Sequence, residues 1–390
     1  MIRVGFVLGA SFLGSINYYR NLLTAISQLP DPEIQPILFV GEAFDESQLT
    51  GFPNIDVHKS RWFDRLSPRW IAHKSLLSLG SPDPLFSRFL RQERINILSH
   101  GDPVRATKDF ASLCWIPDFQ HTKLPEFFGR SEIRYRDRKF RQQCRLATRV
   151  ILSSFDAQSD LRAFCSECVE KSRVLRFVAI PSRPVSFDEA SIARVREKYH
   201  LGDEPYFFLP NQFWAHKNHT LVVRALQQFT DAKKRPLVVA TGDTTDYRNR
   251  NYFENLMKMV ESVGVSDSFR VLGRIAYDDV ATLMEHCIAV INPSRSEGWS
   301  TSVEEAKSLG KRVLLSDIAV HREQNPQDGL FFDVDDADGL ATVMNTTAEE
   351  WNPNTEQKRH RLATAQLPTR IRDFGFTYQE IVREALNKDH

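Results

Sequence analysis

The sequence predicts an α/β protein with two doubly wound parallel-sheet domains that face a central cleft. At 390 residues the chain is too long for one ordinary hydrophobic core. Short apolar segments alternate with amphipathic helical stretches, which is typical of parallel α/β architecture. Pro181 and Pro184 interrupt this alternation, because proline fits neither a central strand nor a helix interior. We therefore expect domains over residues 1–183 and 184–372.

The first half of the chain opens on the apolar stretch 2–8, which lacks a following small-residue cleavage site. It predicts a buried strand rather than a signal peptide. An amphipathic stretch over 15–29 predicts the first helix. Further strands are expected at 36–40, 94–99, 111–116, 149–153 and 173–178.

The second half repeats the pattern, and its apolar runs lack polar alternation, as expected for strands buried on both faces. In such sheets ligands bind beyond the carboxyl ends of the strands, which points to a site between the domains. Strands are expected at 206–209, 237–240, 269–272, 288–292 and 312–316, and helices at 218–229, 252–263, 277–286 and 300–309.

Composition excludes several classes of protein. No apolar run approaches the roughly 20 residues of a membrane-spanning helix. Five cysteines, an odd number, argue against a disulfide framework and favour a reducing compartment, so we expect a cytoplasmic protein. Residues 1–190 hold 26 Lys and Arg against 21 Asp and Glu, whereas the remainder holds 25 against 29.

Much of the positive excess lies in the segment 130–149, where eight basic residues face only Glu132 and Asp137. One interpretation is a solvated helix face. The other is a surface for anionic lipid or a phosphorylated acceptor, which would place the protein on the inner face of the membrane. No nucleic-acid partner is expected, because the rest of the chain is not basic and few aromatic residues interleave the run.

The stretch 292–306 carries the most specific signal. A strand delivers the chain to Glu297-Gly298, and a helix then opens with hydroxyl residues, where free N–H groups and the helix dipole form an anion site. Glu305 lies one turn into that helix, and seven residues separate it from Glu297. Two carboxylates at this spacing suit the two ends of an elongated polyol phosphate.

This stretch resembles the glutamate–seven–glutamate signature of the retaining family-4 glycosyltransferases (glycosyl transferases group 1), and the likeness continues over 308–317. The resemblance implies the GT-B fold: an acceptor-side Rossmann-like domain, a nucleotide-sugar-binding Rossmann-like domain, and a C-terminal helix over 373–390 that packs back on the first domain. It also implies hexose transfer, with retention, from a nucleoside-diphosphate sugar to an acceptor hydroxyl. A UDP- or GDP-sugar donor, a glycan or lipid-linked acceptor and a role in polysaccharide biosynthesis are expected.

Carried over by position, Glu297 binds hydroxyls of the transferred sugar and Glu305 binds the nucleotide ribose. The family usually has Gly-Leu-Pro or similar where Ser300-Thr301-Ser302 stands, but a phosphate site made of backbone tolerates that change. The other interpretation is an N-capped helix with surface glutamates. The resemblance assigns the diphosphate to the amides of Gly298, Trp299, Ser300 and Thr301.

Other positions in the second half support the resemblance. Lys217 matches a lysine that clamps the diphosphate, whereas Gln212 stands where the family has an arginine. A neutral amide is a weaker phosphate ligand than a guanidinium. Asn218 is expected to cap the next helix. Gly242 matches a glycine turn, and Arg274 with Ile275 matches the base-binding segment.

Three candidates lie in the first half. Gly14 looks like the glycine whose amide approaches the donor, although a plain strand-to-helix turn is the alternative. Asp118 and His121 follow another strand, where relatives often have a His-Asp pair. With Glu297 they are the expected catalytic residues; otherwise Asp118 caps a turn and His121 is an exposed loop residue.

Two further patterns are discounted. Cys165 and Cys168 have CxxC spacing without a second pair or a nearby histidine cluster, and the acidic run 333–338 reads as turn and N-cap chemistry. We expect no essential metal and no cofactor besides the donor substrate.

The expected mechanism is front-side substitution, because no carboxylate pair for double displacement is evident. A GT-B sugar-nucleotide epimerase and a non-catalytic nucleotide-sugar-binding relative remain as alternatives.

Overall fold

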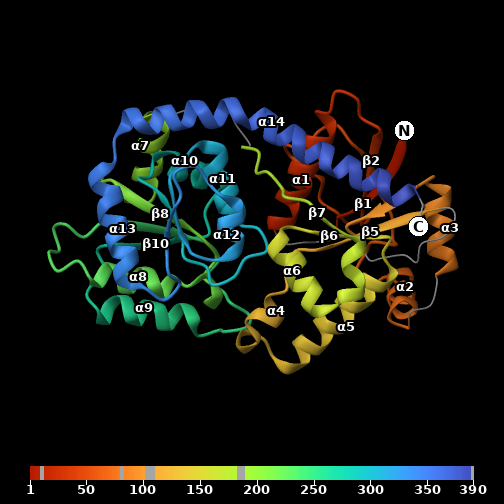
Figure 1. Ribbon diagram of the computed structural model, residues 1–390, viewed down its shortest axis with the longest axis horizontal. Coiled ribbons are helices and arrows are strands. Elements are labelled where there is room, and N and C mark those ends of the chain that lie inside the picture. The colour runs from red at the N-terminus through yellow and green to blue at the C-terminus, as the bar shows by residue number, and fades with distance from the viewer. Residues whose placement is uncertain (9–12, 80–82, 102–109, 182–188, 388–390) are drawn as a thin grey trace. The chain divides into compact units, whose positions relative to one another are not determined.

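The computed structural model describes residues 1–8, 13–79, 83–101, 110–181 and 189–387, and the expected linker at 181–184 lies almost wholly outside them (Figure 1). The chain forms two compact units. Unit 1 contains Met1–Phe119, Arg130–Ala179 and Thr369–His390, and unit 2 contains Gln120–Gly129 and Ile180–Pro368. These units differ from the expected domains 1–183 and 184–372 chiefly in the segment Gln120–Gly129, which belongs to unit 2.

Unit 1 is built on a seven-stranded sheet of order β3-β2-β1-β4-β5-β6-β7, and every pairing is parallel. The expected strands form, and the sequence missed only the short β3 at the sheet edge, whose residues are exposed or half-buried. The strands are β1 Ile2–Val7, β2 Ile34–Val40, β3 Asp56–Lys59, β4 Ile97–Ser99, β5 Ala111–Ile116, β6 Arg149–Leu152 and β7 Ser172–Val174.

The helices of unit 1 begin where the sequence supplies caps. The side chains of Ser67, Asp83 and Ser154 accept from amides of the first turn of α2, α3 and α6. The helices are α1 Leu13–Ser27, η1 Glu46–Leu49, α2 Pro68–Ser78, α3 Pro84–Gln92, α5 Arg130–Leu146, α6 Phe155–Phe164 and η3 Ser166–Lys171.

The last helix, α14 Pro353–Leu386, is much longer than the expected 373–390 (Figure 1). Pro368 lies inside it and does not end it, and the division between the units falls directly after this residue. The part after Pro368 joins unit 1: the buried Tyr378 hydroxyl donates to Ser99 Oγ at 2.8 Å. Gly375 packs on α1, since a Cβ there would lie 2.6 Å from the Ala25 carbonyl oxygen.

Unit 2 has a six-stranded parallel sheet of order β10-β9-β8-β11-β12-β13. Its strands are β8 Tyr206–Pro210, β9 Leu237–Thr241, β10 Phe269–Gly273, β11 Val290–Asn292, β12 Val313–Ser316 and β13 Leu330–Phe332. Its helices are α4 Gln120–Lys123, η2 Pro125–Phe127, α7 Glu189–Lys198, η4 Ala215–Lys217, α8 His219–Gln227, α9 Tyr252–Ser262, α10 Tyr277–His286, α11 Thr301–Leu309, α12 Ala319–Gln324 and α13 Ala337–Glu350.

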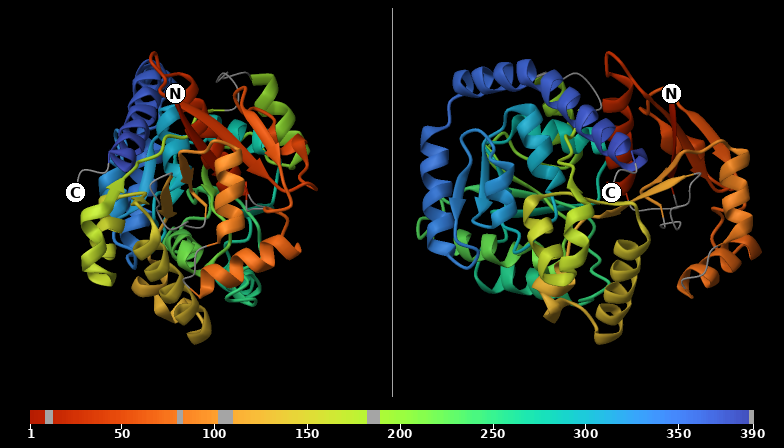
Figure 2. Two further views of the ribbon diagram at one scale, coloured as in Figure 1. Left: turned by 90° about the vertical axis from the view of Figure 1, so that its right-hand side faces the viewer. Right: turned by 45° about the vertical axis from the view of Figure 1, so that its right-hand side comes forward.

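Two apolar clusters show that the second sheet is doubly wound. Leu221, Leu256 and Leu340, from α8, α9 and α13, belong to one cluster. Ile192 and Val303, from α7 and α11, belong to the other. Helices therefore cover both faces of the sheet, which explains why its strands read as uninterrupted apolar runs (Figure 2).

The structure also describes the acidic run 333–338 and the cysteines with CxxC spacing. Asp336 caps α13 by accepting from Gly339 N, as expected for the acidic run. Cys165 and Cys168 lie with their sulfurs 2.8 Å apart in the core of unit 1, and both are buried. No helix in the described part of the chain has the length and apolarity needed to cross a membrane.

Candidate active site

The candidate site lies along one edge of the sheet of unit 2. Because all six strands are parallel, the loops that follow them meet at the same edge. Gly242 joins three of these loops: its N–H donates to the Gly273 carbonyl at 2.9 Å, and a Cβ here would lie 2.4 Å from the Asn211 oxygen. Its φ of +145° also favours glycine. Gly242 thus holds the Gln212 loop beside β9 and β10.

Lys217 and Glu297 form an ion pair across two of these loops. Lys217 Nζ lies 2.6 Å from Glu297 Oε1, and the two side chains are only 15% and 8% exposed. Burial of Glu297 raises the pKa of its carboxyl group, but the Lys217 ammonium, together with His216 and a hydrogen bond from Ser294, more than offsets this effect and the pKa falls to about 2. Glu297 is therefore a carboxylate at neutral pH, able to accept hydrogen bonds but not to give a proton.

Asn218 fixes the loop that carries Lys217, although in another way than expected. Its side chain makes no cap bond to α8; instead Nδ2 donates to the carbonyls of Pro293 at 3.2 Å and Val334 at 2.9 Å. The residue has a left-handed φ of +58°, which turns its amide toward these acceptors. The expected cap is wrong, and Asn218 links neighbouring loops.

The loop between β11 and α11 is braced by buried polar side chains. Asn292 Nδ2 donates to Ser300 Oγ at 2.7 Å, so the N-cap hydroxyl is not used to cap α11. Gln324 accepts from Ser300 N at 3.2 Å and donates to Ser300 O at 3.0 Å. The Ser300 amide is therefore engaged within the protein. The next amides, beginning with Thr301, have no acceptor within the helix and remain the candidate anion site.

Glu305 lies at a different part of this edge from Glu297. Tyr277 donates its hydroxyl to Glu305 Oε1 at 2.8 Å, and Tyr277 starts α10, two residues after Ile275. Ile275 is half-buried and Arg274 is exposed. The structure thus places Glu305 beside the segment expected to bind the base.

The glutamate next in sequence has a structural role. Glu304 is 1% exposed and bonds to Gln324 and Lys307, each at 3.1 Å. Of the two adjacent glutamates, Glu304 thus braces the loop, and Glu305 is the one that faces Tyr277. Trp299 is buried, and Gly298 beside it is half-buried.

The expected catalytic residues fall in both units. His121 lies in α4 within unit 2, and Gln120 Nε2 donates to Ser296 O at 3.4 Å, which brings this segment to the Glu297 loop. His121 is buried, packing edge-on against Phe128 at 6.4 Å, so the alternative of an exposed loop residue is wrong. Two candidates belong to unit 1: Asp118 is half-buried after β5, and Gly14 lies in the first turn of α1.

Sequence reasoning missed Tyr277, Asp246 and Arg248, which contact site loops. Tyr277 had no distinguishing pattern around it. Asp246 accepts from Ala215 N at 3.0 Å, and its only sequence signal was a polar stretch directly after the Gly242 turn.

Within the described residues, one group of side chains has its ligand atoms close enough together to hold a metal ion: Cys165, Glu167 and Cys168 in unit 1. Burial raises the pKa of Cys165 to about 12, so this thiol is protonated at neutral pH. The group belongs to a different unit from the site around Glu297.

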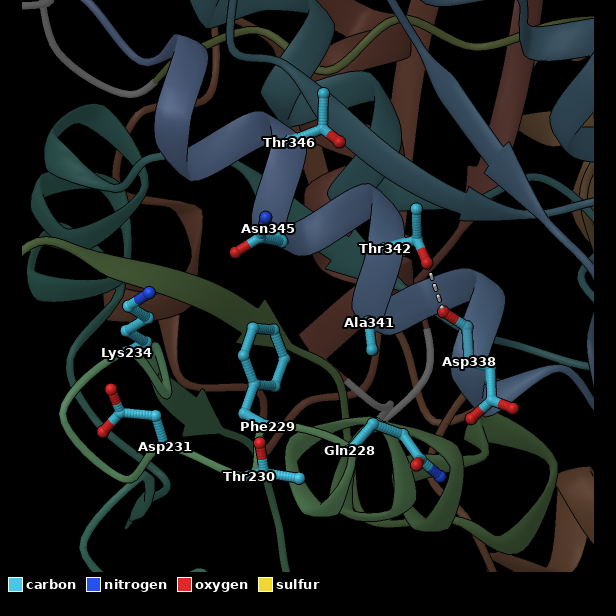
Figure 3. A pocket seen from close by; sticks show the side chains of 10 residues that line it. All are labelled: Gln228, Phe229, Thr230, Asp231, Lys234, Asp338, Ala341, Thr342, Asn345 and Thr346. Carbon is cyan, nitrogen blue, oxygen red and sulfur yellow. Dashed lines mark hydrogen bonds between the residues drawn. The ribbon is translucent and has the colours of Figure 1, made fainter.

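A separate hollow of about 570 Å³ lies between the end of α8 and α13, with Phe229 at its centre (Figure 3). None of the predicted site residues lines it. Its polar groups bind within the protein: Asp231 accepts from Lys233 N and Asn345 donates to Glu349. It therefore supplies no argument for a ligand.

Known proteins resemble this chain in sequence. Residues 191–366 match the family model for glycosyl transferases group 1. This part of the chain is a glycosyltransferase group 1 domain. The O-antigen chain mannosyltransferase RfbU of Salmonella typhimurium is 26% identical over 133 residues, which are 34% of this chain and 35% of that protein. The match thus spans about a third of this relative.

Solved glycosyltransferases share the fold over nearly the whole chain. A glycosyltransferase from Rickettsia africae superimposes with a TM-score of 0.68 at 15% identity, covering 100% of this chain and 99% of that one. Anabaena Alr3699/HepE in complex with UDP and glucose gives 0.65 at 17% identity, covering 98% and 99%. The GT-B fold is confirmed, and residues 191–366 match the family that the sequence resembles. The roles of individual site residues and the domain boundaries stay predictions.

Removing the Lys217 charge tests the ion pair through its pH dependence. In wild type the pKa of Glu297 is depressed, so the pair's contribution to stability is present above about pH 4.5 and is lost as pH falls toward 2. In Lys217→Ala the group that most strongly opposes burial is removed, so the Glu297 pKa rises from its wild-type value. We expect a loss of about 3 kcal/mol at pH 7 that shrinks as pH falls to 4, measured by urea unfolding.

The matched control is Lys258→Ala, which breaks an exposed pair with Glu254 in the same unit. It should leave the unfolding midpoint unchanged at both pH values. If Lys217→Ala behaves like this control, or if its cost does not depend on pH, the buried pair is not as described.

Proposed function

We propose that the chain is a retaining glycosyltransferase that moves a hexose from a nucleoside-diphosphate sugar to an acceptor hydroxyl. The observation that carries the proposal is the buried Lys217–Glu297 pair at the amino end of α11, within a glycosyltransferase group 1 domain. One ammonium, one carboxylate and the open amides of a helix end form a site with two kinds of binding group. A sugar joined to a diphosphate requires this combination.

Different residues along the sheet edge bind different parts of the donor in this proposal. The Lys217 ammonium and the first free amides of α11 bind the diphosphate. The Glu297 carboxylate accepts hydrogen bonds from hydroxyls of the sugar. Glu305, held by Tyr277, accepts from the two ribose hydroxyls. We assign His121 and Asp118 to the transferred sugar or the acceptor hydroxyl.

The ionisation of Glu297 limits the chemistry that it performs. A carboxyl group with a pKa of about 2 cannot serve as a general acid at neutral pH. In the proposed reaction the bond from the anomeric carbon to the diphosphate breaks, and the acceptor oxygen bonds to that carbon on the same face. The acceptor proton passes to the leaving diphosphate. The main contribution of the protein is then stabilisation of the charge that develops on this leaving group.

The relatives guide the choice of substrates. Anabaena HepE was crystallised with UDP-glucose, and RfbU is an O-antigen chain mannosyltransferase. We propose a UDP- or GDP-sugar as donor and a glycan or lipid-linked acceptor used in polysaccharide synthesis.

A thermal-shift screen with UDP, GDP, ADP and CMP, and then with their sugar conjugates, tests the donor site. We expect one diphosphate to stabilise the protein selectively, because a base-specific site discriminates by its hydrogen bonds. Glu305→Ala should abolish the shift, whereas Glu349→Ala, an exposed glutamate on α13, should retain it.

Product formation completes this test. Glu297→Gln removes the carboxylate but keeps the shape of the side chain, so transfer should be lost while the protein stays folded. The anomeric configuration of the product, read by NMR, should equal that of the donor. No shift with any diphosphate would contradict the proposal, and conversion of the donor sugar without an acceptor would indicate an epimerase.

We also propose that unit 1 contacts an anionic membrane through α5. Its basic residues form a stripe, because Arg130, Arg134 and Arg138 recur every four residues on one helix face and all are exposed. Within the described chain no ion pair joins these three to a carboxylate. Arg141 and Arg145 extend the exposed stripe by a further turn.

The neighbouring helix adds apolar groups to this region. Gln142 of α5 donates to the Leu77 carbonyl near the end of α2, so the two helices meet at this point. Ile71 is 47% exposed and Leu79 is 77% exposed. Exposed arginines and exposed aliphatic side chains on these two helices suit a surface that is anionic and has an apolar layer beneath, as a bilayer of acidic lipid has.

Sedimentation with vesicles tests this contact. Wild type should bind vesicles of phosphatidylcholine with phosphatidylglycerol but not pure phosphatidylcholine, and high salt should weaken binding. The variant R134E/R138E should bind at least about tenfold more weakly, since each basic residue contributes roughly 1 kcal/mol. The control K233E/K234E reverses two exposed lysines of unit 2 and should bind normally. Equal binding of both variants would refute the assignment to α5.

A further inference from the structure

Arg248 is a nearly buried cation in the loop after β9, close to the candidate site. Its side chain is 6% exposed, and Nε lies 3.3 Å from Asp246 Oδ1. Nη2 lies 3.1 Å from His216 Nδ1. An arginine nitrogen carries only donors, so the His216 nitrogen must accept. The guanidinium therefore binds one carboxylate and one neutral imidazole.

These contacts fix the loop that presents Lys217. Asp246 Oδ2 accepts from Ala215 N at 3.0 Å, and the His216 carbonyl accepts from Arg295 N at 2.8 Å. Of the two residues directly before Lys217, Ala215 is thus held by Asp246, a partner of Arg248, and His216 binds Arg248 itself. Burial lowers the pKa of His216 to about 3, so its ring stays neutral and keeps accepting throughout the neutral range.

Aromatic rings surround the same guanidinium. The Arg248 carbon Cζ lies 5.0 Å from the ring centroids of Trp214 and Phe128, and 5.5 Å from that of Tyr247. At these distances a guanidinium is attracted to the ring faces. Phe128 belongs to the segment Gln120–Gly129, which also carries His121.

We propose that Arg248 is a positioning residue, which holds both the Lys217 loop and the His121 segment in the geometry that the donor site requires. The structural part depends on the contacts of Arg248 alone. Its effect on nucleotide binding rests on the proposed function. Arg248 does not touch the reacting atoms in this account, since it acts through residues 214–216 and through Phe128.

The matched variants are Arg248→Met, Arg248→Lys and Arg235→Met. Methionine keeps the apolar bulk but loses the charge and the donors, whereas lysine keeps the charge but cannot reproduce the planar fork. Arg235 serves as the control, because it lies in the same unit and donates to the Gly264 and Phe229 carbonyls, away from the site loops. A loss of stability common to both methionine variants then reports only the removal of a partly buried arginine.

Hydrogen–deuterium exchange on the full chain without ligand tests the structural part. We expect peptides covering 212–218 and 120–129 to exchange at least about threefold faster in Arg248→Met than in wild type or Arg235→Met. Arg248→Lys should give an intermediate rate. If exchange in both segments is unchanged in Arg248→Met, or rises equally in Arg235→Met, the inference is overturned.

Binding of UDP and GDP, measured by calorimetry, and turnover with the identified donor test the functional part. Arg248→Met should weaken binding of the preferred diphosphate about tenfold, or about 1.4 kcal/mol, and lower kcat about 10- to 100-fold. Loosened loops with unaltered affinity and kcat would overturn the positioning role. If wild type binds neither diphosphate, the proposed function fails, while faster exchange in the two segments would still support Arg248 as their anchor.

Discussion

The Lys217–Glu297 ion pair joins the loops that follow β8 and β11, which are neighbouring strands of the sheet in unit 2. Two opposite charges removed from water stabilise each other, whereas a single unpaired charge in such surroundings is strongly unfavourable. The pair therefore specifies one arrangement of these loops and keeps Glu297 ionised. The proposed site for a sugar diphosphate depends on that arrangement.

Buried neutral side chains brace the loop that carries Glu297. Asn292, Ser300 and Gln324 are each almost completely buried and hydrogen-bond to one another. Buried polar groups stabilise a structure only when their hydrogen bonds are satisfied, so such a network favours one loop conformation over its alternatives. Asn218 and Gly242 extend this support to the loops after β8 and β9. The site is thus largely formed before any ligand binds.

Local patterns in the sequence predicted the two parallel sheets, because buried parallel strands leave uninterrupted apolar runs. They also located the helix that begins after Glu297. The edge strands β3 and β13 are only four and three residues long, which is too short for a recognisable apolar run. The last helix was expected only from residue 373, yet α14 begins at Pro353 and continues through Pro368. Side-chain pairing across 80 residues, as between Lys217 and Glu297, leaves no periodic trace in the sequence.

The sequence predicted the candidate site only in part. Glu297, Glu305 and Lys217 were identified as candidates by position, but the direct contact of two of them was not. The sequence did not indicate Asp246 and Arg248 as site residues, because their partners, Ala215 and His216, lie about 30 residues earlier in the chain. Asn218 was assigned a local cap, whereas its partners are distant carbonyls.

A double-mutant cycle on the ion pair tests the account most directly. Lys217→Met, Glu297→Gln and the double variant would be compared with wild type by urea unfolding at pH 7. If the pair organises the site, each single variant leaves a buried charge unpaired, and the double variant loses less stability than the two single variants together, by about 2 kcal/mol. Additive losses would show that the two charges do not depend on each other and would contradict the account.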